Sequence, residues 1–121
     1  MLLEHQRLPV IRKEKVRGGV GELLCRDYLA GDEPGHPFAA LGLNEMQPGA
    51  TIAEHRHQGE AEFYFVTAGR GTGLHQGRRF AVGPGDAWLC RDGETHGIEN
   101  TSVPGQVLSF VSIFFRPPKP A

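Results

Sequence analysis

Short apolar runs broken by turn residues are the feature that most limits what this chain can fold into. Seventeen glycines and nine prolines separate these runs, and no stretch sustains a 3.6-residue period. The pattern predicts an all-β domain, a sandwich or a barrel. We expect strands over residues 22–29, 38–46, 51–56, 61–67, 71–75, 78–82, 86–90, 97–100 and 106–115.

The turn signals between these strands give no sign of a domain boundary. A loop is expected over residues 31–37, and the prolines of residues 117–120 favour an extended tail because proline cannot donate to a β-ladder. We therefore expect a single domain over residues 1–121. It should comprise N-terminal strands and a loop (1–37), the barrel (38–115) and the tail (116–121).

Charge and hydropathy exclude several classes of partner. Thirteen basic residues against fourteen acidic ones give a formal net charge of −1, so no basic field is available for nucleic acid or an anionic membrane. The first residues carry charge instead of the apolar stretch of a signal peptide, and no apolar run is long enough to span a membrane. Two cysteines, Cys25 and Cys90, do not make a disulfide scaffold, so we expect reduced thiols in a cytoplasmic protein.

Strand alternation brings four ligand-type residues together. His55 and His57 are two residues apart on one predicted strand and should point to the same side, and Glu62 follows after a turn on the next strand. His96 comes later, beside another glycine turn. Three imidazoles and one carboxylate suit Fe(II), Mn(II), Ni(II), Zn(II) or Co(II), whereas Ca²⁺ and Mg²⁺ prefer oxygen ligands. The lack of thiolates argues against a closed structural zinc site.

The residues around these ligands resemble the two motifs of the cupin superfamily. The stretch from Gly49 to Gly69 (GATIAEHRHQGEAEFYFVTAG) fits G(X)5HXH(X)3-4E(X)6G at every fixed position. The stretch from Gly85 to Asn100 (GDAWLCRDGETHGIEN) fits G(X)5PXG(X)2H(X)3N, except that Arg91 replaces proline. The chain looks like a small single-domain microbial cupin, similar to mannose-6-phosphate isomerase-like and oxalate decarboxylase-like members.

This resemblance implies a fold, a cofactor and an oligomeric state. The fold would be a double-stranded β-helix, or jelly roll, holding one divalent transition metal per subunit through His55, His57, Glu62 and His96. Many cupins are homodimers, some with an exchanged N-terminal strand. A homodimer is also predicted from the residues, because apolar side chains occupy both faces of the strands at residues 61–67 and 106–115.

Tyr64 is the candidate catalytic residue, because it should share the face of Glu62 and could bring a phenol into the pocket. The alternative is a packing aromatic. Trp88 is expected as a pocket wall and Cys90 as a core thiol. Arg91 is expected to be a solvated loop residue, although a guanidinium there could also bind an anion.

The remaining carboxylates beside the ligands and the histidines outside the two motifs are not expected to bind metal or substrate. Glu54 and Glu60 should be solvated carboxylates. His5, His36 and His75 should be surface or loop histidines.

Open coordination positions on such a metal favour a metalloenzyme acting on a small, oxygen-rich organic molecule, by isomerisation, decarboxylation or dioxygenation. The alternative is a non-catalytic module that binds a metal and a metabolite. A storage or structural cupin is disfavoured, because such proteins commonly lack the metal ligands that are intact here.

Overall fold

The computed structural model describes residues 1–29 and 38–116. The loop expected at 31–37, with His36, and the tail expected at 117–120 lie outside the described residues. Within these limits the chain forms ten strands and two short 3₁₀ helices, η1 (His5–Arg7) and η2 (Val16–Gly18), and no α-helix. The prediction of an all-β domain is confirmed.

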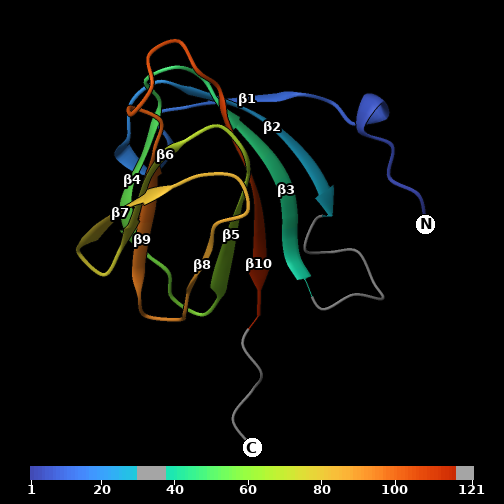
Figure 1. Cartoon of the computed structure of the whole chain (residues 1–121). Helices are drawn as coiled ribbons and strands as arrows, with labels where there is room; N and C mark the ends of the chain where they lie inside the picture. The colour runs from blue at the N-terminus through green and yellow to red at the C-terminus, as the bar shows by residue number, and fades with distance from the viewer. Residues whose placement is uncertain (30–37, 117–121) are drawn as a thin grey trace, which may run out of the picture.

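Two antiparallel sheets form the barrel (Figure 1). The first has the order β1-β2-β3-β10-β5-β8 and the second the order β4-β9-β6-β7. The strands of the larger sheet are β1 (Ile11–Glu14), β2 (Glu22–Leu29), β3 (Phe38–Met46), β10 (Leu108–Phe115), β5 (Ala61–Ala68) and β8 (Ala87–Cys90). Those of the smaller sheet are β4 (Thr51–Arg56), β9 (Thr95–Glu99), β6 (Gly71–His75) and β7 (Arg78–Val82).

Five predicted strands, β2, β3, β4, β6 and β7, have the expected bounds. β1 was not predicted, and β9 begins two residues earlier than expected, so that His96 lies inside a strand instead of in the turn before it. β5 runs one residue longer than expected, and β8 and β10 begin one and two residues later.

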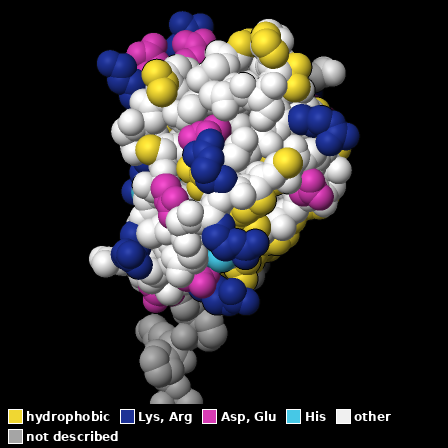
Figure 2. Space-filling view, turned by 60° about the vertical axis from the view of Figure 1, so that its left-hand side comes forward, with side chains coloured by type: hydrophobic (Ala, Val, Ile, Leu, Met, Phe, Trp, Pro, Cys, Tyr) yellow, Lys and Arg dark blue, Asp and Glu magenta, His cyan; other side chains and the backbone are white. Residues whose placement is uncertain are grey.

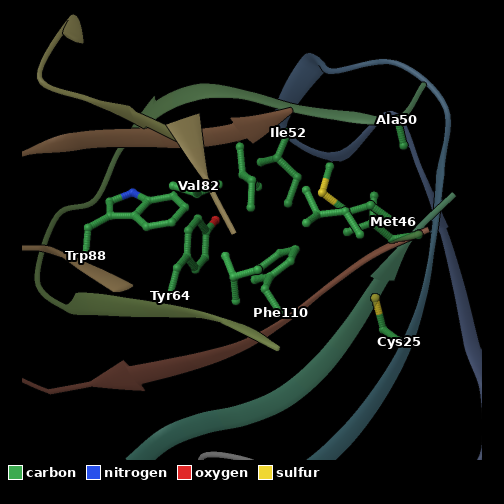
Figure 3. Packing of buried hydrophobic residues seen from close by; sticks show 12 residues of the cluster. Cys25, Met46, Ala50, Ile52, Tyr64, Val82, Trp88 and Phe110 are labelled. Atoms are coloured by element: carbon green, nitrogen blue, oxygen red, sulfur yellow. The ribbon is translucent and has the colours of Figure 1, made fainter. Parts of the chain in front are cut away.

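The core fills the space between the sheets. Its side chains are at most 9% exposed and include Tyr64, Trp88 and Phe110 (Figure 3). The Tyr64 ring packs edge-on against Trp88 at a centroid distance of 5.3 Å and against Phe110 at 4.8 Å. The aromatic side chains of β5, β8 and β10 thus pack together within the core.

A β-bulge in β4 sets the orientation of its histidine. Ile52 pairs with Ile98 and His55 pairs with His96, so three residue steps on β4 oppose two on β9. The extra residue lets Ile52 and His55 both face inward although they are three positions apart. Gly97 lies opposite this bulge, where an added Cβ would be 2.6 Å from the carbonyl oxygen of Ile52. Only glycine allows the two strands to approach this closely here.

Asn100 directly follows β9, the strand that contains His96. Its side chain is 1% exposed, and its Nδ2 group donates to the carbonyl oxygens of Met46, Gln47 and Gln106. The asparagine of the second motif therefore holds together the ends of three chain segments.

The described surface carries charges of both signs. On the face shown in Figure 2, basic and acidic side chains are interspersed. Among the residues described, no helix is long and apolar enough to cross a membrane.

Candidate metal centre

Four predicted ligands meet inside the barrel. His55 lies on β4, His57 directly follows β4, His96 lies on β9 and Glu62 lies on β5 of the opposite sheet. One ligand atom from each residue lies within 4.8 Å of all the others. The Nε2 atom of His57 is 3.1 Å from Nε2 of His55 and 3.0 Å from Nε2 of His96. The Oε1 atom of Glu62 is 3.0 Å from Nε2 of His57 and 2.8 Å from Nε2 of His96.

Outer contacts orient two of the imidazole rings. His55 Nδ1 is 2.7 Å from the carbonyl oxygen of Ala53, and His57 Nδ1 is 3.4 Å from Oε1 of Glu60. A carbonyl oxygen only accepts, so Nδ1 of His55 carries the proton and, in the neutral ring, its Nε2 presents a lone pair.

Burial keeps the site in the protonation state that metal binding requires. Desolvation lowers the pKa of His55 to about 4 and outweighs the hydrogen bond to Ala53, which raises it. Burial also lowers the pKa of His96. For Glu62 burial alone would raise the pKa, but contacts with His57 and His96 outweigh it, and the pKa lies below its ordinary value. Neutral His55 and His96 with an ionised Glu62 form a donor set for a cation.

The donor atoms fit a divalent ion. Nε2 of His57 lies 3.1 Å from Nε2 of His55 and 3.0 Å from both Nε2 of His96 and Oε1 of Glu62. Two ligand atoms bound at about 2.1 Å and at right angles lie roughly 3 Å apart, close to the four separations found here.

Tyr64 lies against this cluster. Its ring stacks on the imidazole of His96, with a centroid distance of 4.2 Å and an interplanar angle of 17°. Burial, followed by the charge of Glu62, raises its pKa well above 10, so the hydroxyl stays protonated. Tyr64 also lines the pocket beside the ligands. The ring therefore packs as the alternative expected, and a catalytic role for Tyr64 stays a prediction.

A small pocket opens from the ligand cluster. It has a volume of about 110 Å³, and its lining includes His55, Glu62 and Tyr64. Asn44 and Ser112 contribute two mostly buried polar side chains to the same pocket, joined by a hydrogen bond of 3.0 Å. The remaining wall is largely apolar and includes Leu23, Ile52, Phe110 and Phe114.

Several residues singled out in the sequence lie outside the cluster. His75 pairs in register with His96, but its Nε2 atom contacts Glu94 at 3.2 Å. The side chain of Arg91 is 68% exposed in its loop. Trp88 packs in the core and is not among the pocket residues. The Cys90 thiol is buried and donates to the carbonyl oxygen of Glu94.

Three charged residues at the site were not predicted from the sequence. Glu60 was expected to be solvated, but its carboxylate contacts His57, and its position three residues after that histidine was the available signal. Lys13 and Arg17 line the pocket although they precede the motifs by more than thirty residues. No local pattern indicates that the N-terminal segment reaches the metal centre.

Comparison with known proteins gives one family match. The family model described as "Cupin domain" matches residues 42–111, more than half of the chain. An oxalate-binding protein of Thermotoga maritima is 28% identical over 101 residues, which make up 84% of this chain and 84% of that protein.

Solved structures share the architecture over nearly the whole chain. A predicted oxalate decarboxylase from Thermotoga maritima has a TM-score of 0.89 at 26% identity, covering 97% of this chain and all of that one. The polyketide cyclase RemF from Streptomyces resistomycificus has a TM-score of 0.75 at 24% identity, covering 99% of this chain and 82% of that one. The second similarity concerns the fold alone.

Proposed function

The chain belongs to the cupin family, and we propose that it binds one divalent transition metal per subunit through His55, His57, Glu62 and His96 and uses it to hold a small carboxylate. The observation that carries the proposal is the convergence of four ligand atoms, one from each residue, within 4.8 Å of one another. Three nitrogens and one carboxylate oxygen suit iron, manganese, cobalt, nickel or zinc. Such an ion, when bound, supplies a Lewis acid for oxygen ligands.

A carboxylate ligand is supported by the pocket and by the relatives. The volume of about 110 Å³ is smaller than the ~150 Å³ cavity that accepts benzene, so the ligand should be a molecule of a few atoms. The Thermotoga maritima relative is named for oxalate binding, and the similar solved structure for predicted oxalate decarboxylation. Oxalate is therefore the first ligand to test.

We further propose that the protein is an enzyme and that its reaction is of the decarboxylase or lyase type. Tyr64 is the candidate acid, because its buried, protonated phenol lines the pocket next to Glu62. Isomerisation and dioxygenation are the other reactions that this donor set supports. The alternative is binding without turnover, which the name of the oxalate-binding relative favours. Incubation of metal-loaded protein with oxalate separates the two: turnover yields formate and carbon dioxide, and binding alone leaves oxalate intact.

Elemental analysis tests the metal site. Protein purified without nickel resin, or reconstituted with each candidate metal, should contain close to one ion per chain. His57→Ala should abolish binding because its Nε2 atom lies next to those of His55 and His96. His75→Ala should keep the metal, because its ring contacts Glu94. No metal in any reconstituted sample, or equal loss in both variants, would contradict the assignment.

We also propose a cytoplasmic homodimer. The larger sheet presents two apolar cross-strand ladders away from the core, and a second subunit would cover them. The ladders are Phe63, Ile113, Leu41 and Leu29, and Phe65, Val111 and Leu43. Two buried free thiols agree with a reducing compartment.

A further inference from the structure

Two cationic side chains line the pocket of the candidate metal centre. Lys13 on β1 and Arg17 on η2 both line the cavity that contains His55 and Glu62. Both side chains belong to exposed residues. Within residues 1–29 and 38–116 neither forms an ion pair or a side-chain hydrogen bond, whereas the neighbouring Arg12 pairs with Glu22 at 3.4 Å. Their charges are therefore available to a ligand.

Backbone hydrogen bonds fix the position of the segment that carries Arg17. The backbone N–H of Lys15 donates to the carbonyl oxygen of Gly21, and the N–H of Thr51 on β4 donates to the carbonyl oxygen of Val20. At Gly19 an added Cβ would lie only 2.0 Å from the carbonyl oxygen of Thr51. The side chain of Val16 packs against the core. Arg17, next in sequence to this anchored residue, is held at the pocket by the main chain.

The backbone at this point is strained. Lys15 and Arg17 have φ values of 50° and 55°, in the left-handed region that non-glycine residues seldom occupy. Two such residues within three positions are often found where a side chain must be placed for function. A glycine at position 17 would adopt this conformation without strain, yet the chain has an arginine there.

Charge balance then indicates the ligand class. The buried carboxylate of Glu62 offsets one charge of a divalent ion, which leaves one net positive charge at the centre and two more on Lys13 and Arg17. A guanidinium binds carboxylate oxygens through paired hydrogen bonds, and an ammonium adds a point charge. The pocket also provides the polar side chains of Asn44 and Ser112.

We propose that Arg17 and Lys13 form an anion-binding subsite that makes this metal centre selective for small dicarboxylates over monocarboxylates. The inference rests on the proposed function, because the metal would bind one carboxylate of the ligand. The two cations would then bind the oxygens of the second carboxylate. Arg17 is the stronger contributor because its planar group can make two hydrogen bonds, and Lys13 contributes the second charge.

Calorimetric titration of metal-loaded protein with oxalate, malonate and acetate tests the subsite. Arg17→Gln should weaken oxalate and malonate binding by about 10- to 100-fold, the range expected for a hydrogen bond to a charged group. It should change acetate binding much less. Lys13→Gln should act in the same direction with a smaller effect. Arg78→Gln is the matched control, since Arg78 is exposed on β7 and is not among the pocket residues.

Arg17→Gly separates a positioning role from a merely structural one. This variant removes the guanidinium and also relieves the left-handed strain, so its melting temperature should be equal to or above that of the wild type. Its affinity for oxalate should nevertheless fall as in Arg17→Gln. A lower melting temperature together with unchanged oxalate affinity would show that Arg17 serves the fold and would overturn the inference.

Metal content, measured on the same samples, distinguishes failure of the subsite from failure of the proposed function. If the wild type takes up no metal, the proposed function fails and the subsite with it. If metal and oxalate bind but Arg17→Gln and Lys13→Gln behave like Arg78→Gln, the subsite is wrong and the proposed function stands. Metal-loaded protein that binds none of these carboxylates would also overturn the subsite.

Discussion

At the scale of single residues, the imidazole of His57 is fixed from two sides. Its Nε2 atom faces the other ligands, and its Nδ1 atom contacts the Glu60 carboxylate at 3.4 Å. A proton donated from Nδ1 to this carboxylate would leave Nε2 available to a metal. Glu60 is partly exposed, which means that it can be removed without opening the core.

Glu60→Ala should weaken metal affinity by about 10- to 100-fold, the usual effect of removing a partner of a ligating histidine. The physical reason is that the His57 ring loses the acceptor that orients it. Competition with a chelator measures the change, and Glu4→Ala, which removes an exposed carboxylate paired with Arg7, is the control. An affinity equal to that of the control would exclude a supporting role for Glu60.

The thiol of Cys90 should react slowly with Ellman's reagent at pH 8. Burial, together with the charges of Glu94 and Glu62, raises its pKa from 9.0 to about 11. The thiol therefore stays protonated at pH 8 and gains nucleophilic thiolate only as the pH rises toward 11. Stopped-flow absorbance should show both cysteines reacting fast in denaturant and slowly in the native protein. A fast reaction of one thiol in the native protein would contradict the burial of both Cys25 and Cys90.

Sequence reasoning predicts that the four candidate ligands lie together because strand alternation is a local property. The two histidines of His55-Arg56-His57 face inward together, and Glu62 shares its face with Tyr64, as residue parity requires. Arg17 could not be found in this way. Its position depends on how an irregular segment packs on the start of β4, and no periodicity encodes that contact.

At the scale of the elements, the turn after β9 depends on one side chain. Asn100→Ala should lower the free energy of unfolding by about 1–3 kcal/mol, because three carbonyl oxygens lose their buried donor. Urea denaturation followed by fluorescence measures the loss. Thr101→Ala, at an exposed neighbouring position, should leave stability nearly unchanged. A similar small effect in both variants would mean that water replaces the amide.

Strand β1 was not predicted from the sequence, because it forms through pairing with a neighbouring strand. All four of its residues are exposed, so it shows no alternation of apolar and polar side chains. It becomes a strand only by pairing with β2, from Ile11 opposite Cys25 to Glu14 opposite Glu22. The strands with one buried face, by contrast, follow the sequence pattern closely.

At the scale of the whole molecule, light scattering at micromolar concentration should give about twice the monomer mass. Phe65 is 38% exposed and lies in one of the apolar ladders of the larger sheet. Phe65→Ser should weaken the dimer, whereas Val103→Ser, which changes an equally exposed loop residue, should leave it intact. A monomeric wild-type protein would count against the dimer.

The candidate ligands are divided between the two sheets, with His55 and His96 on one, His57 directly after its strand β4, and Glu62 on the other. A bound ion is therefore a cross-link that must break before the sheets can separate. By mass action, free metal at 100 times its dissociation constant stabilises the closed barrel by about 2.7 kcal/mol. When the surrounding metal becomes scarce, the barrel opens more often and proteases gain access to its strands. The lifetime of this protein in a cell should consequently follow the local supply of its metal.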